Sequence, residues 1–152
     1  NADVVVNFDV DAKGNVASVR HRLGGWERNG QRVEDSRAQR VLAYAEDTAK
    51  RIKTQKPAAN SEAVIRKLFT SLAEGKPDYD SFTPQMADLT RQQLSNLQPF
   101  VASLGSMKAL RFKKVNEGGG DEFEADFEKG ALNVMMSLDE DGRIAGAWFG
   151  PR

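Results

Sequence analysis

Hydrophobic and polar residues alternate along the start of the chain with the two-residue period of a β-strand. Val4, Val6, Phe8 and Val10 occupy every second position, and the segment Asp11–Asn15 has the composition of a turn. Residues 16–23 return as a second strand, and the pairs Gly24-Gly25 and Asn29-Gly30 interrupt the chain after it. The pattern predicts a β-hairpin appendage over residues 1–34.

The period then changes to that of amphipathic helices. We expect a helix over residues 36–54, a second over 61–74 and a third from Thr83-Pro84 to Gly105, with Pro99 kinking or splitting the third. The linker at 55–60 is the best candidate for a domain boundary. Residues 35–57 would therefore be a connecting helix and linker, and residues 58–152 a separate folding unit.

Strand periodicity returns near the end of the chain, at about 107–115, 121–128, 131–138 and 143–149. A hairpin turn at Lys129-Gly130 would pair Phe127 with Leu132, Ala125 with Val134 and Phe123 with Met136, all on one apolar face. The next hairpin, at residues 139–142, would pair Leu138 with Ile144 and place Trp148 on the same inner face. The other face would carry Glu122, Glu124, Asp126 and Glu128, paired across strands with Arg111 and Lys113.

Helices followed by an antiparallel meander with one apolar face predict an α+β fold, in which the helices cover that face of a curved sheet.

The composition of the chain reduces the number of functional classes to which the protein can belong. The 22 basic and 22 acidic residues cancel, which disfavours nucleic acid as a partner. The chain has no cysteine and one histidine, His21, which argues against cysteine- or histidine-based metal centres. No apolar run is long enough to predict a membrane span.

Three segments of the sequence carry a resemblance to a known family: GKPDYDSFTPQMADLTRQQL at 75–94, LQPFVASLGSMKALRFKKV at 97–115 and GGDEFEADFEKGALNVMMSLDEDGRIAGAWFGP at 119–151. They resemble the C-terminal domain of β-lactamase-related serine hydrolases, which looks like the nuclear-transport-factor-2-like, or cystatin-like, cone. Residues 3–34 resemble the terminal hairpin of the small β module that precedes that domain. The resemblance implies a serine-hydrolase-like domain as partner in the native protein, and a periplasmic or secreted location.

The resemblance does not extend to the catalytic residues of serine hydrolases. No serine in this chain has a lysine three residues on, and Gly-x-Ser-x-Gly is absent, so neither nucleophile motif is present. His21 lies between Arg20 and Arg22 and is interpreted as a surface or edge-strand residue rather than a general base. We therefore predict no catalytic, cofactor-binding or metal-binding residues in this chain.

Five residues are candidates for lining a pocket inside the cone, namely Tyr79, Phe123, Phe127, Met136 and Trp148. The alternative interpretation is that they are core residues packed on the helices. The leading functional hypothesis is a non-catalytic accessory or interaction domain beside a serine hydrolase, with a homodimer as a further candidate assembly. The alternatives are a module that binds a small apolar ligand in the cone and an isomerase- or cyclase-like enzyme.

Overall fold

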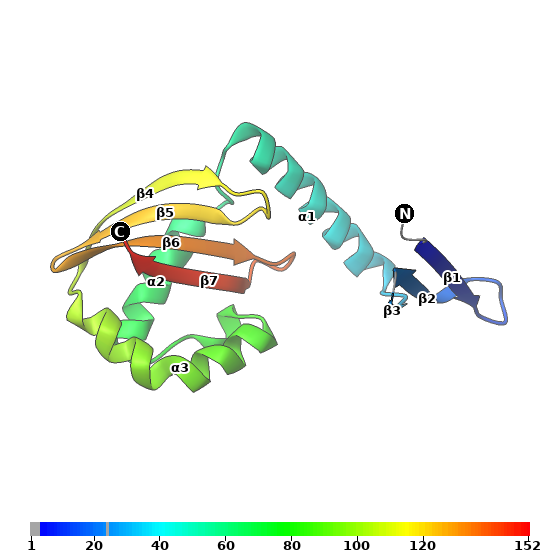
Figure 1. Cartoon of the computed structure of the whole chain (residues 1–152), viewed down its shortest axis with the longest axis horizontal. Coiled ribbons are helices and arrows are strands. Elements are labelled where there is room, and N and C mark those ends of the chain that lie inside the picture. Colours follow the sequence, from blue (N-terminus) through cyan, green and yellow to red (C-terminus); the bar gives the residue numbers. More distant parts are fainter. Residues whose placement is uncertain (1–3, 24) are drawn as a thin grey trace. The chain divides into compact units, whose positions relative to one another are not determined.

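The computed structural model describes residues 4–23 and 25–152 and shows an α+β protein (Figure 1). That part of the chain forms three α-helices and two antiparallel sheets, one of three strands and one of four. The chain divides into two compact units, Asn1–Gln39 and Arg40–Arg152. The division falls inside helix α1 (Asp35–Thr54), upstream of the linker at which the sequence suggests a boundary.

The first unit contains the three-stranded sheet β1-β2-β3, made of β1 (Val4–Val10), β2 (Val16–Leu23) and β3 (Trp26–Gln31). The predicted turn between β1 and β2 is present. The Asp11 carboxylate accepts hydrogen bonds from the backbone N–H groups of Lys13 and Asn15, at 2.8 and 2.9 Å. Residues 1–3 and Gly24, which the sequence analysis included in the hairpin and its following break, lie outside the described residues.

The strand β3 was not expected, because Asn29-Gly30 was interpreted as a break in the chain. In the structure Gly30 lies opposite Val19 in the β2–β3 ladder. A Cβ atom at position 30 would lie 3.1 Å from Cγ1 of Val19, so glycine allows the Val19 side chain to pack closely over the strand. The glycine therefore serves a close contact within the sheet, and the predicted hairpin is a three-stranded meander.

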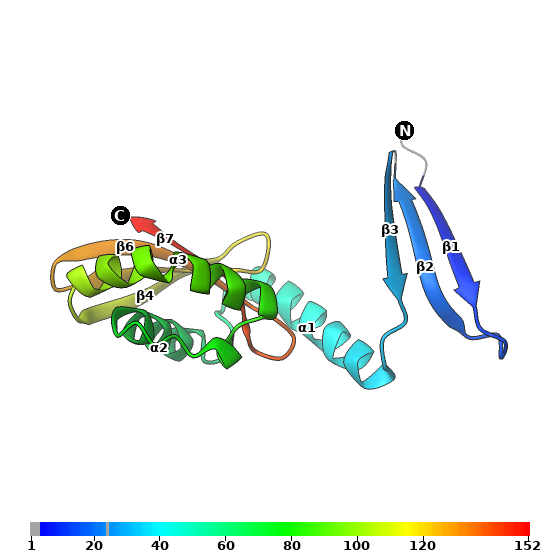
Figure 2. The same cartoon turned by 90° about the horizontal axis from the view of Figure 1, so that it is seen from below.

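The second unit is built on the four-stranded sheet β4-β5-β6-β7. Its strands are β4 (Met107–Val115), β5 (Asp121–Phe127), β6 (Gly130–Leu138) and β7 (Ile144–Pro151). Helices α2 (Ser61–Ala73) and α3 (Pro84–Ser103) pack against each other, and α3 also contacts β7 (Figure 2). The Thr83 hydroxyl caps α3 by accepting from the Met86 N–H, as predicted, but α3 is not split at Pro99.

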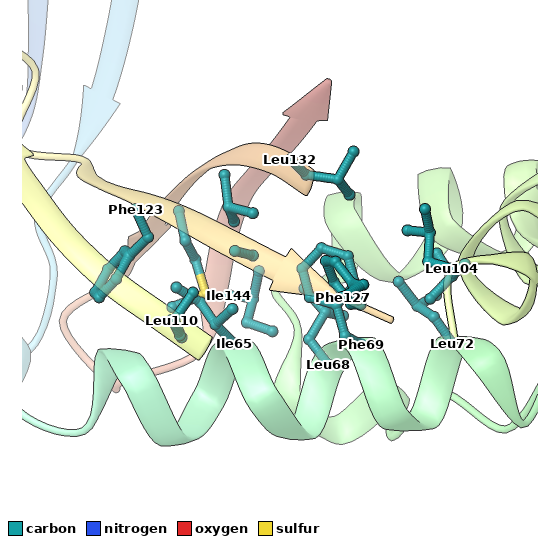
Figure 3. Close-up of a cluster of buried hydrophobic side chains, with 14 of the residues drawn as sticks. Ile65, Leu68, Phe69, Leu72, Leu104, Leu110, Phe123, Phe127, Leu132 and Ile144 are labelled. Carbon is teal, nitrogen blue, oxygen red and sulfur yellow. The ribbon is translucent and has the colours of Figure 1, made fainter. Parts of the chain in front are cut away.

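The core of this unit lies between α2, α3 and one face of the sheet (Figure 3). Strand β5 alternates strictly, since its residues Asp121, Phe123, Ala125 and Phe127 are buried and those between them are half-exposed. Phe127 packs against Phe69 of α2, with ring centroids 5.2 Å apart. The apolar stripe of α2 and the apolar face of the meander thus cover each other, as their matching periodicities predict.

The predicted register between β5 and β6 is wrong by two residues. Phe127 pairs with Gly130, Ala125 with Leu132 and Phe123 with Val134, so the turn residues are Glu128-Lys129 rather than Lys129-Gly130. The backbone N–H groups of Glu128 and Lys129 donate to the carbonyls of Ser106 and Leu104, which removes both residues from the β5–β6 ladder. Because a shift of two residues preserves the side-chain alternation, the predicted inner face is correct although the partners are not.

The predicted position of Trp148 on the inner face is also wrong. Leu138 pairs with Ile144 as expected, but the next pair is Ser137 with Gly146, so Ala145 is an extra residue on β7. This β-bulge reverses the alternation of the rest of the strand. Phe149 turns toward the core and contacts Phe69, with ring centroids 5.1 Å apart, whereas Trp148 is 56% exposed.

The bulge predicts opposite costs for two adjacent aromatic residues. Phe149→Ala should lower the free energy of unfolding by about 3 kcal/mol, because it removes a ring packed against Phe69. Trp148→Ala should lower it by about 1 kcal/mol or less, since most of that side chain is already in water. Urea denaturation followed by circular dichroism measures both. A larger loss for Trp148→Ala would contradict the register of β7.

Candidate functional site

Three of the five candidate pocket residues are core residues of the second unit. Phe123, Phe127 and Met136 are 3%, 8% and 1% exposed, and all belong to the apolar cluster between the sheet and the helices. Figure 3 shows Phe127 against Phe69 in the middle of the cluster and Phe123 near Leu110 at one end. The side chains of Phe123, Phe127 and Met136 pack against their neighbours in the cluster, so these three residues fill the interior.

The other two candidates are not fully buried, although Tyr79 packs against the edge of the core. Tyr79 belongs to a short 3-10 helix, Tyr79–Ser81, and the Arg91 guanidinium lies 4.3 Å from its ring centroid. This is a cation–π contact between two surface elements. Trp148 lies on the outer face of the sheet, because the extra residue Ala145 reverses the alternation of β7. The structure therefore does not bring the five residues together around one cavity.

An apolar groove does lie beside the core, between α2, α3 and β7. It has a volume of about 160 Å³, and Trp148 is the one candidate residue at its margin. Its other lining residues are Leu68, Leu72, Phe82, Met86, Leu89, Thr90, Gln93, Leu97, Ala147 and Phe149. Sites for drug-sized ligands have volumes of roughly 300–1,000 Å³. This groove is smaller than such a site.

The sequence analysis missed a buried ion pair between Arg51 of α1 and Asp121 of β5. The Arg51 Nη2 donates to Asp121 Oδ1 at 2.6 Å and to the Gly119 carbonyl at 2.9 Å. The second carboxylate oxygen, Asp121 Oδ2, accepts from the backbone N–H of Ala58 at 2.9 Å. The side chains of Arg51 and Asp121 are 9% and 2% exposed. Both carboxylate oxygens of Asp121 thus accept hydrogen bonds from the protein, and the ion pair connects α1 to β5.

The sequence did contain a signal for this pair. Asp121 is in phase with Phe123, Ala125 and Phe127, so strict alternation places its carboxylate on the buried face. A buried carboxylate requires a cation and hydrogen-bond donors. This signal points to Asp121 alone, because adjacent helix positions face different directions and Lys50 and Lys53 also lie near Arg51 in the predicted helix.

The outer face of the sheet carries the predicted pairing of opposite charges. Lys113 Nζ lies 2.9 Å from Glu124, and Arg111 Nη2 lies 2.6 Å from Asp126. The hydrogen bond from Lys113 lowers the pKa of Glu124, and the hydrogen bond from Arg111 lowers the pKa of Asp126. These carboxylates are therefore ionised and paired at neutral pH, which is the arrangement expected of a solvated sheet face.

Asp139 lies in a hairpin turn and His21 on a strand. The carboxylate of Asp139 accepts from the backbone N–H groups of Asp141 and Arg143 at 3.0 and 2.8 Å, which closes the β6–β7 hairpin as a turn. His21 lies on the central strand β2 rather than on an edge strand, opposite Val6 and Arg28. Among the described residues no group of three or more His, Cys, Asp or Glu side chains is arranged to hold a metal ion.

Comparison of the chain with protein-family models, with curated proteins and with solved structures gives no match. No helix in the described part of the chain is both long and apolar enough to cross a membrane.

The Arg51–Asp121 pair predicts which fragment folds. A fragment of residues 40–152 should unfold cooperatively, because it keeps the pair. A fragment of residues 58–152 lacks Arg51 and leaves a buried, uncompensated carboxylate, which costs roughly 3–5 kcal/mol. Urea denaturation of the two fragments measures the difference.

Single variants of the 40–152 fragment provide the control. Arg51→Met should reproduce most of the loss, whereas Arg66→Met, which removes an exposed pair with Glu62, should cost less than about 1 kcal/mol. Equal stability of the 40–152 and 58–152 fragments would show that the pair does not hold α1 to the sheet.

Proposed function

We propose that this chain is a non-catalytic accessory domain that binds another protein domain through its three-stranded sheet. The partner that we propose is the serine-hydrolase-like domain implied by the family resemblance, and a periplasmic or secreted location follows from the same resemblance. The cone fold of that family is part of the proposal for the second unit. The observation that carries the proposal is the exposure of one apolar face of the first unit.

The register of the sheet gathers seven apolar side chains on one side, together with His21 and Arg28, whereas Val5 lies on the other side. Phe8 pairs with Val19, Val10 with Val16 and Leu23 with Trp26, and cross-strand partners share a face. We call this the apolar face, and its residues are Val6, Phe8, Val10, Val16, Val19, Leu23 and Trp26. Six of the seven are exposed, with Trp26 at 82%, Phe8 at 63% and Val10 at 62%. A hollow of about 240 Å³ lies on it, lined in part by Phe8, Val16 and Gly30.

The opposite face is polar and internally paired. Asp9 accepts hydrogen bonds from Ser18 at 2.7 Å and from Arg20 at 3.1 Å, and the hydrogen bond from Ser18 is the largest cause of its lowered pKa. An antiparallel sheet with one apolar and one polar face is the pattern of a sheet that is covered on one side. The three-stranded sheet is thus amphipathic, and the apolar face is the side on which we propose that a partner protein binds.

Exposure of this face is energetically unfavourable in water. Burial of apolar surface contributes roughly 25 cal/mol per Å², and isolated contiguous apolar patches mark interaction sites. Small sheets also depend on a covered hydrophobic face for their stability. A protein surface that covers Phe8, Val10 and Trp26 would therefore stabilise the sheet and gain affinity from the same contact.

The second unit supports a binding role over the alternatives. Its interior is filled by the apolar cluster, and the groove of about 160 Å³ beside it is small for a ligand site. The ionisable groups within its core are Arg51 and Asp121, which neutralise each other. This arrangement suits a scaffold better than a proton-transfer site, which requires an ionisable group facing a cavity.

Two valines on β1 give a matched test of the apolar face. Val10→Ser changes the apolar face, and Val5→Ser makes the same change on the polar face. Titration with the partner hydrolase domain should shift the fluorescence emission of Trp26 to shorter wavelength as its ring leaves water. We expect Val10→Ser to weaken binding by ~10-fold, corresponding to about 1.4 kcal/mol, and Val5→Ser to change it by less than ~2-fold.

The outcomes separate the candidate partners. Absence of binding to the hydrolase domain, or equal effects of the two valine variants, would contradict the proposal. Sedimentation of the chain alone tests the homodimer. Self-association that is lost in Val10→Ser and retained in Val5→Ser would assign the apolar face to a second copy and replace the hydrolase as partner.

The chain by itself should not turn over nitrocefin or p-nitrophenyl esters, because it lacks both serine-nucleophile motifs. Spectrophotometric assays of the purified chain measure this. Turnover that disappears when one serine of the chain is replaced by alanine would show a catalytic centre that the motifs do not reveal.

A further inference from the structure

A second exposed surface lies on the outer face of the four-stranded sheet, in the second unit and independent of the apolar face. A groove of about 730 Å³ runs across this sheet face. Four of its lining residues, Lys114, Glu122, Met135 and Trp148, are consecutive cross-strand partners on β4, β5, β6 and β7. The volume lies within the range of about 300–1,000 Å³ that is usual for small-molecule sites.

Trp148 forms one wall of this groove and is held outward by the structure. The bulge at Ala145 turns the side chain away from the core. Its six-membered ring lies over Gly150. A Cβ atom at position 150 would be only 3.0 and 3.1 Å from Cζ2 and Cη2 of Trp148. Glycine at 150 thus leaves room for the indole against the strand, and 56% of the side chain remains exposed. A large indole held in this way is available for stacking with a ligand.

The polar groups of the groove select for an uncharged ligand. Lys113 and Lys114 are paired with Glu124 and Glu122, at 2.9 and 3.5 Å. An anionic ligand would compete with these carboxylates for the lysines, and a cationic ligand would compete with the lysines for the carboxylates. A neutral ligand can instead add hydrogen bonds to the ammonium and carboxylate groups without breaking the pairs. Asn116 and Asn133 also line the groove. Asn116 Oδ1 accepts from the N–H groups of Gly118 and Gly120 and Asn133 Nδ2 donates to the Pro151 carbonyl, so Asn116 can add a donor and Asn133 an acceptor.

A neutral ligand with many hydroxyl groups and one apolar face is a saccharide. The axial C–H groups of a pyranose ring form a flat apolar surface that stacks on an indole, while its hydroxyls lie at the ring edge. We propose that the groove beside Trp148 binds a neutral oligosaccharide, with one pyranose ring on Trp148 and its hydroxyl groups directed to Lys114, Glu122 and Asn133. This binding activity does not depend on the partner proposed for the apolar face.

The fluorescence of Trp148 provides the test. The chain has two tryptophans, so Trp26→Phe leaves Trp148 as the single reporter. The probes are cellohexaose, chitohexaose and maltohexaose, and pull-down with insoluble cellulose, chitin and starch distinguishes a polymer from a free oligosaccharide. We expect at least one hexasaccharide to change the emission saturably, with a Kd of about 1 mM or tighter.

Variants then assign the site by calorimetry or saturation-transfer NMR. Trp148→Ala should weaken binding by at least ~10-fold, and Gly150→Val should weaken it by displacing the ring, while Trp26→Ala leaves it unchanged. Circular dichroism checks that both variants of β7 remain folded. The proposal is overturned if none of the three hexasaccharides binds, if Trp148→Ala binds as tightly as the unchanged chain, or if AMP competes for the groove more tightly than every hexasaccharide.

Discussion

The second unit depends on one buried interaction, the ion pair between Arg51 and Asp121. It joins three segments that are distant in sequence, since Arg51 lies on α1, Asp121 begins β5, and the Ala58 N–H that also binds Asp121 belongs to the connection between α1 and α2. A buried ion pair adds little net stability by itself, but loss of one partner is strongly unfavourable. Arg51 therefore ties the second half of α1 to the start of β5, and the chain between α1 and α2 is anchored at Ala58.

The two faces of the four-stranded sheet have different physical roles. The inner face is packed with aliphatic and aromatic side chains, including Phe69, Phe127 and Phe149. The outer face is covered by ion pairs whose members remain partly hydrated, such as Lys113 with Glu124. Binding in this unit is therefore expected at the surface, at Trp148, rather than in the interior. The three-stranded sheet differs because its apolar face has no helix of its own unit packed on it among the described residues.

The sequence was sufficient to predict the elements and the faces, and insufficient to predict pairing details. Strand alternation placed Phe123, Ala125 and Phe127 correctly, since the period of side chains is a local property of the backbone. The turn at Glu128-Lys129 was misplaced because the carbonyls of Leu104 and Ser106, which are distant in sequence, bind its N–H groups. Trp148 was misplaced because Gly146, which as a glycine inside a strand can mark a β-bulge, was interpreted as part of a regular strand. The five candidate pocket residues were grouped by residue type and predicted face, whereas the structure buries Phe123, Phe127 and Met136 and exposes Trp148.

The bulge at Ala145 also constrains how this sequence can vary. Loop tips tolerate gains and losses of single residues, whereas a one-residue shift in a paired strand exchanges its two faces. Loss of Ala145 would leave a regular strand in which Gly146 still pairs with Ser137, so Trp148 would stay outside and Phe149 inside. Natural variants of this chain can therefore lose the residue between Ile144 and Gly146, whereas gain or loss of one residue between Gly146 and Phe149 would turn Phe149 into water and should be selected against.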